Sequence, residues 1–133
     1  MGIILDSSVL LTWLVSPDKE KSEHCRKLIG GYIDELYSHD LLNYEVSNAL
    51  VFTTRKQELI GEAYSVYELL PISFLKLNST EYKLAREISI AVRDSVYDAS
   101  YHALAITKSM EFVTCDRKYY KKAKHLGFIR LID

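Results

Sequence analysis

The sequence predicts an α/β sandwich with a mostly parallel central sheet, built from a single domain that spans residues 1–133. Short apolar runs of strand length alternate along the chain with longer segments whose apolar residues recur at helical spacing. A chain of 133 residues is long enough to bury a core without disulfides, and it contains no repeat, low-complexity tract or linker. These observations indicate one α/β domain.

Five short segments have the composition of buried strands. The first and the fourth are the clearest, because each is an apolar run that leads to an aspartate and then to a helical pattern. Pro71 separates the third strand from the helix before it, since proline does not continue a helix. The predicted strands are Ile3–Asp6, Leu36–Ser38, Ile72–Leu77, Glu111–Cys115 and Phe128–Ile132.

Helical segments connect these strands. Ser8 is the expected N-cap of the first helix, which reaches Val15 and ends before Pro17. A glycine pair, Gly30 and Gly31, is expected to end the second helix, because glycine often follows the last helical turn. The remaining predicted helices are Lys19–Ile29, a segment from Asp40 that carries Glu45, Glu58–Leu70, Thr80–Arg93 with Thr80 as its cap, a segment that carries Asp98, and Asp116–His125.

Charge and composition exclude several classes of function. The formal net charge is −1, from 17 basic and 18 acidic residues, which argues against a protein that coats DNA through charge alone. Cys25 and Cys115 form no C-x-x-C pair, and the histidines lack the spacing of a zinc site. Two cysteines this far apart in sequence are typical of a reducing compartment. No apolar stretch approaches the ~20 residues that span a bilayer, and no signal peptide is visible, so we expect a cytoplasmic protein without a membrane partner.

Four acidic residues in four separate segments are the candidate functional residues: Asp6, Glu45, Asp98 and Asp116. Asp6 and Asp116 end predicted strands, and ligands gather at the carboxyl ends of parallel strands. Asp98 lies on a predicted helix. Glu45 is either a solvated charge or, because it borders the apolar stripe of another helix, a carboxylate that needs a partner. We therefore expect the four carboxylates to meet in one pocket at the carboxyl edge of the sheet.

Taken singly, the aspartates have alternative explanations. Asp6 and Asp116 stand where aspartate often caps a helix. Ser95-x-x-Asp98 has the pattern of a capping box. Asp94, one turn before Asp98, is interpreted as a surface charge. The case for a site therefore depends on the four acids together.

An all-oxygen donor set of this kind suits Mg²⁺ or Mn²⁺ rather than zinc or copper. Carboxylates that are packed together repel one another and raise one another's pKa values. Enzymes use such sites for phosphodiester hydrolysis, in which the metal activates a water molecule and stabilises charge on the phosphoryl oxygens. The predicted cofactor is therefore Mg²⁺ or Mn²⁺, and the predicted reaction is hydrolysis of a nucleic acid.

The segments around the four acids are Leu5–Leu11, Asn43–Leu50, Val96–Ala105 and Val113–Arg117. In their order and spacing they resemble the successive signatures of PIN-domain nucleases, above all the small VapC-type toxins of prokaryotic toxin–antitoxin pairs. The resemblance covers nearly the whole chain and implies a three-layer α/β/α PIN-like fold. It also implies that Asp6, Glu45, Asp98 and Asp116 are the catalytic, metal-ligating residues.

The resemblance extends to neighbouring polar residues. Ser8 and Thr114 match residues that hydrogen-bond the carboxylates, and Asn48 either shares that role or is simply a polar helix residue. The expected function is that of a metal-dependent endoribonuclease acting as a toxin, and the preference for RNA comes only from the resemblance. The alternative is a non-catalytic PIN-like subunit that binds RNA or another protein.

Partner surfaces are less distinct in the sequence. Arg117, Lys118 and Lys121 on the last predicted helix form either a solvated face or a phosphate-binding edge for the RNA substrate. The resemblance also implies a homodimer and a small antitoxin. Four rings on the N-terminal helices form either part of the core or the dimer surface, and these are Trp13, Phe52, Tyr64 and Tyr67.

Overall fold

The computed structural model describes residues 1–53 and 56–133. Within them, five strands form one sheet with the order β3-β2-β1-β4-β5, and every pairing is parallel. The strands are β1 (Ile3–Leu5), β2 (Leu36–His39), β3 (Ser73–Leu75), β4 (Glu111–Thr114) and β5 (Ile129–Leu131). The predicted α/β class is confirmed, and the sheet is parallel throughout.

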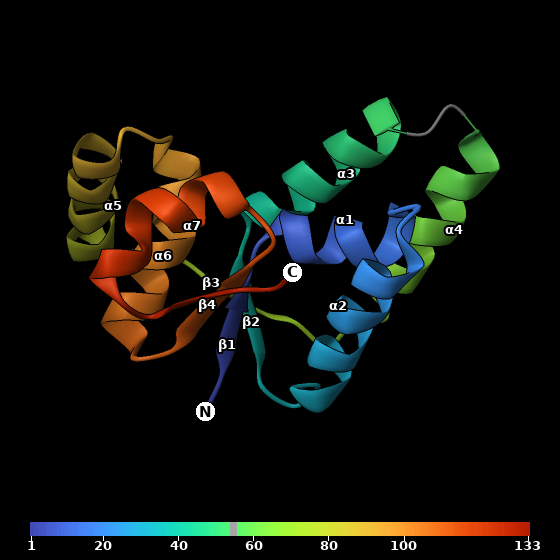
Figure 1. Cartoon of the computed structure of the whole chain (residues 1–133), viewed down its shortest axis with the longest axis horizontal. Helices are drawn as coiled ribbons and strands as arrows, with labels where there is room; N and C mark the ends of the chain where they lie inside the picture. The colour runs from blue at the N-terminus through green and yellow to red at the C-terminus, as the bar shows by residue number, and fades with distance from the viewer. Residues whose placement is uncertain (54–55) are drawn as a thin grey trace.

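Helices cover both faces of the sheet and complete a three-layer arrangement (Figure 1). Helices α1–α4 gather on one side and α5–α7 on the other (Figure 1). The helices are α1 (Ser7–Val15), α2 (Lys19–Gly31), α3 (Leu41–Thr53), α4 (Gln57–Glu68), α5 (Ser79–Val92), α6 (Val96–Lys108) and α7 (Arg117–Ala123), followed by a 3₁₀ turn, η1 (Lys124–Leu126). In the part of the chain that the structure describes, no helix is long and apolar enough to cross a membrane.

The core has two halves because successive side chains of a strand point to opposite faces of the sheet. Ile3 and Leu5 of β1 belong to the cluster formed with the N-terminal helices. Ile4 belongs to the other cluster, together with Phe112 of β4 and the apolar faces of α5 and α6. The central strands are therefore buried on both sides, as a sheet between two helical layers requires.

The aromatic rings of the N-terminal helices divide between core and surface. Tyr67 is buried and donates a hydrogen bond to Asn43 Oδ1 at 2.7 Å, so of the two alternatives the core is correct for this ring. Trp13 and Tyr64 are partly buried against the same core cluster. Phe52 is 81% exposed and is the one ring of the four that lies fully on the surface.

Three predicted helix ends are wrong, and the local hydrogen bonds explain why. Asp6, not Ser8, caps α1, because its carboxylate accepts the N–H groups of Ser8 and Val9. Asn78, not Thr80, caps α5, because asparagine and Glu81 form a reciprocal capping box. Helix α2 also continues through its glycine pair, to Gly31, and Tyr32 follows as the C-cap residue.

Glu81 ties α5 to the helix that carries Asp98. It is only 1% exposed, and its Oε2 accepts a hydrogen bond from Thr107 Oγ1 of α6 at 2.6 Å. Its Oε1 accepts the backbone N–H of Asn78 at 2.9 Å. The position of α6 relative to α5 is therefore fixed by a buried polar contact as well as by apolar packing.

Replacing this carboxylate should destabilise the fold. We expect Glu81→Ala to lower the free energy of unfolding by about 2–3 kcal/mol, because hydrogen bonds to a charged group are lost and buried donors remain unpaired. Urea denaturation measures this change. The matched control is Glu87→Ala, at an exposed position of the same helix, which should change stability by less than about 0.5 kcal/mol. Equal effects of the two substitutions would contradict this role of Glu81.

Candidate active site

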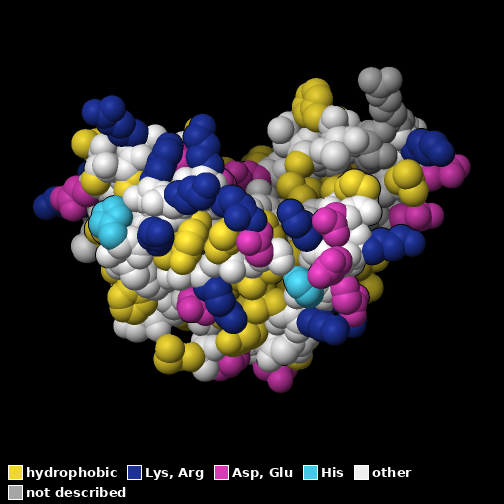
Figure 2. All heavy atoms as spheres, viewed as in Figure 1, with side chains coloured by type: hydrophobic (Ala, Val, Ile, Leu, Met, Phe, Trp, Pro, Cys, Tyr) yellow, Lys and Arg dark blue, Asp and Glu magenta, His cyan; other side chains and the backbone are white. Residues whose placement is uncertain are grey.

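The four candidate acids come from four elements that meet near one edge of the sheet. Asp6 follows β1 and Asp116 lies just beyond β4, and these two strands pair directly, with Leu5 beside Val113. Glu45 lies on α3, and Asp98 lies in the first turn of α6. Figure 2 shows acidic side chains at the base of the notch between the two groups of helices, with Lys and Arg side chains along the α5–α7 side.

Asp6 is held at the centre of the site by hydroxyl groups. It is 7% exposed, and its Oδ2 accepts a hydrogen bond from Thr114 Oγ1 at 2.6 Å. Its Oδ1 accepts from Ser8 Oγ at 2.5 Å and from the Ser8 N–H at 3.0 Å. Burial nevertheless raises the pKa of Asp6 to about 6, against the lowering effect of these hydrogen bonds.

Ser8 and Thr114 join the ends of the two central strands. Their hydroxyl oxygens lie 3.2 Å apart. Ser8 Oγ also accepts the N–H of Cys115 at 2.8 Å, and Thr114 Oγ1 accepts the N–H of Asp116 at 3.0 Å. The hydroxyls therefore fix Asp6 and the backbone of Asp116 in one network.

Glu45 lies across the site on α3 and is half-buried. The hydroxyl of Tyr101, a buried residue of α6, donates a hydrogen bond to its Oε1. Burial raises the pKa of Glu45. Asn48 is exposed, and among the described residues no hydrogen bond joins it to Glu45. Tyr101 therefore provides the contact that was one of two alternatives for Asn48, and the sequence offers no signal for so distant a partner.

Asp98 is surrounded by other acids. Its pKa is raised to about 7, first by burial, then by the neighbouring carboxyl group of Asp94, and then by the charges of Asp116 and Asp6. The same carboxyl is not used to cap its helix, because Ser95 accepts the Asp98 N–H at 3.0 Å while the Ser95 N–H is bound by Asp94. The capping box expected from Ser95-x-x-Asp98 is thus only half formed.

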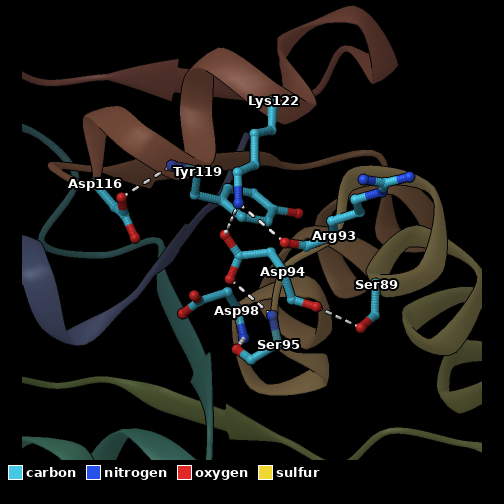
Figure 3. Close-up of polar contacts among 8 residues, drawn as sticks. All are labelled: Ser89, Arg93, Asp94, Ser95, Asp98, Asp116, Tyr119 and Lys122. Carbon is cyan, nitrogen blue, oxygen red and sulfur yellow. Dashed lines mark hydrogen bonds and ion pairs between the residues drawn. The ribbon is translucent and has the colours of Figure 1, made fainter.

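Asp94 is part of this group, so its assignment as a surface charge is wrong. Its side chain is 15% exposed, and its Oδ2 lies 3.4 Å from the ammonium group of Lys122 on α7 (Figure 3). Sequence reasoning missed it because Ser95 marks a helix start, which separates Asp94 from Asp98. The signal that was available is the spacing of the two acids, which differ by one helical turn.

Comparison with known proteins places the chain in a family. The family model described as the PIN domain matches residues 3–125. The chain belongs to the PIN-domain family. The crystal structure of PAE2754 from Pyrobaculum aerophilum is similar, with a TM-score of 0.68 and 21% identity over 93% of this chain and 87% of that one. At this identity the likeness supports the fold alone. No curated protein matches the sequence significantly.

PIN domains form a nuclease family that generally uses divalent metals, and the donor chemistry of this PIN domain suits such ions. The side chains are carboxylates, and the charges of Asp6 and Asp98, and of Asp6 and Glu45, act on one another. In the described ranges, 1–53 and 56–133, no three or more His, Cys, Asp and Glu side chains are grouped closely enough to hold a metal ion as they stand. Among the described residues, the acids are therefore related through the effects of their charges on one another's pKa values.

The basic residues of α7 in this PIN domain differ in their surroundings. Arg117 pairs with Asp133, and both are exposed. Lys118 and Lys121 are exposed on the same helix. Lys122 turns inward and donates a hydrogen bond to the carbonyl of Arg93 at 3.0 Å, which satisfies a carbonyl at the end of α5.

The raised pKa of Asp98 predicts a pH-dependent stability. Because this pKa is about 7 in the folded protein against an ordinary 3.8, the folded state binds more protons between these values, and ionisation of Asp98 destabilises it as pH rises. Asp98→Asn cannot ionise. In EDTA, its melting temperature should exceed that of the native protein above about pH 7, and the excess should fade toward about pH 4.

Comparing the melting temperatures of Asp98→Asn and the native protein cancels the contributions of groups that titrate in both, including the buried histidines. Asp34→Asn, at an exposed position, makes the same chemical change away from the site and should show no such excess. An excess for Asp98→Asn that is constant with pH, or that grows in acid, would be inconsistent with a raised pKa.

Proposed function

We propose that this PIN domain is a Mg²⁺- or Mn²⁺-dependent endoribonuclease that hydrolyses RNA phosphodiester bonds and serves as the toxin of a toxin–antitoxin pair. The observation that carries the nuclease proposal is the meeting of four elements with their acids at one sheet edge, where burial and mutual repulsion raise the pKa values of Asp6 and Asp98. Such a group is stabilised by a divalent cation. The RNA substrate and the toxin role rest on the family resemblance.

The proposed roles follow from how each acid is held. Asp6 is the fixed ligand, because Ser8 and Thr114 bind both of its oxygens. Glu45, Asp98 and Asp116 complete the ligand set. When bound, the cation supplies an activated water molecule and neutralises charge on the phosphoryl oxygens.

The basic residues and the histidines support the same chemistry. Lys118 and Lys121 lie exposed on α7, beyond Asp116, where they can contact the phosphates of the RNA on either side of the scissile bond. His39 and His102 are buried, and burial lowers the pKa of His39 to about 4, so neither is suited to activate a ribose 2′-hydroxyl. We therefore expect products with 5′-phosphate and 3′-hydroxyl ends.

Cleavage of labelled RNA tests this function. The native protein should cleave a single-stranded RNA with Mn²⁺ or Mg²⁺ and lose activity in EDTA. Asp6→Asn should reduce the rate by at least about 100-fold, because it removes the charge of the central ligand while keeping its shape. Asp34→Asn is the matched control and should cleave like the native protein.

The outcomes separate the two candidate functions. RNA that is bound but not cleaved, with any metal, would favour the alternative, a non-catalytic subunit that binds RNA. Products ending in 2′,3′-cyclic phosphate would refute the water-mediated mechanism. Undiminished cleavage by Asp6→Asn would contradict the role of Asp6 as the central ligand.

We also propose that the chain forms a homodimer through the surface of α3 and α4, and that a small antitoxin inhibits it by directing a basic side chain at the carboxylates. The dimer proposal is supported by a group of exposed apolar side chains on these helices, which includes Val51, Phe52, Leu59 and Val66. Leu59 and Val66 border a cavity of about 440 Å³ that Leu14 and Val15 of α1 also line. A surface of this kind favours association.

The dimer proposal predicts a dimeric mass by light scattering at high micromolar concentration. Phe52→Asp should shift the mass toward the monomer, since it places a charge within the proposed interface. Tyr82→Asp, a similar change at an exposed ring of α5, should leave the mass unchanged. A monomer for the native protein would overturn the dimer proposal, and copurification with the neighbouring gene product would decide the antitoxin proposal.

A further inference from the structure

Asp94 lies in a turn that is fixed on both sides. Helix α5 ends at Val92, and its C-cap residue Arg93 has a left-handed φ of 56°. The N–H of Asp94 then donates to the carbonyl of Ser89 at 3.3 Å, and the Asp94 carbonyl accepts from Ser89 Oγ at 2.5 Å. The backbone of Asp94 is thus attached to the last turn of α5 (Figure 3). These two hydrogen bonds fix the backbone position from which the Asp94 side chain extends.

The carboxylate of Asp94 is held by two donors from other elements. Oδ1 accepts the N–H of Ser95, at the start of α6, at 2.7 Å. Oδ2 faces the ammonium group of Lys122 at 3.4 Å, and that group is itself fixed by the carbonyl of Arg93 at 3.0 Å. The carboxylate therefore joins the ends of α5 and α6 to α7, and its charge is compensated.

Asp98 is placed differently. Its carboxyl group lies beside that of Asp94, and the charges of Asp94, Asp116 and Asp6 act on it. Figure 3 shows the carboxyl groups of Asp94 and Asp98 side by side, below α7. Within the described part of the chain, no ion pair joins Asp98 to a basic side chain. One acid of the pair is thus anchored and neutralised, and the other is left for a cation.

We propose that Asp94 is a positioning residue of the metal site: anchored by Ser95 and Lys122, it holds the carboxylate of Asp98 in the orientation that binds the divalent cation. The inference rests on the proposed function, because it assigns Asp98 as a ligand. Mutation of residues that orient metal ligands typically lowers metal affinity about 10–100-fold. Asp94 does this from the turn before α6, with its carboxyl group beside that of Asp98 (Figure 3).

The test measures Mn²⁺ affinity by calorimetry and the melting temperature in EDTA for the native protein and Asp94→Asn. The carboxamide keeps the shape of the side chain and an oxygen that can accept the Ser95 N–H. We expect Mn²⁺ affinity to fall about 10–100-fold. The melting temperature in EDTA should not fall by more than a few degrees, because the partly exposed pair with Lys122 contributes little and repulsion with Asp98 is relieved.

Asp94→Glu and Asp34→Asn complete the design. Asp94→Glu keeps the charge but displaces the carboxylate by one methylene, so a positioning role predicts an intermediate loss of affinity. Native affinity in Asp94→Glu would show that only charge is needed and would overturn the inference. Asp34→Asn removes one negative charge at an exposed position and should bind Mn²⁺ like the native protein.

The remaining outcomes are distinct for the two proposals. If the native protein binds Mn²⁺ and Asp94→Asn binds it equally well, the positioning role is wrong and the proposed function stands. If the native protein binds no Mn²⁺, the proposed function fails and this inference fails with it. A large loss of melting temperature in EDTA with unchanged affinity would assign Asp94 to folding alone.

Discussion

The parallel pairing of β1 with β4 is the constraint on which the site depends. Because Leu5 lies beside Val113, the chain leaves both strands at the same edge of the sheet. Asp6 and Asp116 follow the two strands at that edge. Each aspartate then begins a helix, and each uses one oxygen to cap it: Asp6 Oδ1 for α1 and Asp116 Oδ1 for α7. Capping therefore does not exclude the metal-ligating role proposed for these residues. The cap fixes the position of the side chain at the edge of the sheet.

Gathering carboxylates at one edge destabilises the fold, and the surrounding polar groups offset part of that effect. Thr114 is fully buried, yet its hydroxyl is fully used, since it donates to Asp6 and accepts from the backbone of Asp116. Tyr101 plays the corresponding part for Glu45 from the opposite group of helices. The Thr114 hydroxyl comes from β4 and the Tyr101 hydroxyl from α6. These hydrogen bonds therefore also hold together the elements that carry the acids.

The sequence predicted the features that depend on local pattern. Alternating strands and helices predicted the α/β class, and acids at strand ends predicted which edge of the sheet would carry the charge. It could not predict contacts that depend on tertiary packing. Tyr101 reaches Glu45 across 56 positions of sequence, and Lys122 reaches Asp94 across 28. Competition between nearby caps was also invisible, because Asn78 and Thr80 both have side chains that cap helices, and only the bond to Glu81 decides between them.

The distribution of positive charge gives the divalent cation of the proposed function a second role, between these acids and a phosphate. Lys122 is turned toward Asp94 and the end of α5, and Arg117 is paired with Asp133 at the surface. In the described part of the chain, the acids at the centre therefore keep a negative field, which repels a phosphodiester. Lys118 and Lys121 are exposed on α7, where the proposed function has them contact the flanking phosphates. In that function, a divalent cation beside Asp6 and Asp98 would reverse the local charge and so allow the scissile phosphate to approach.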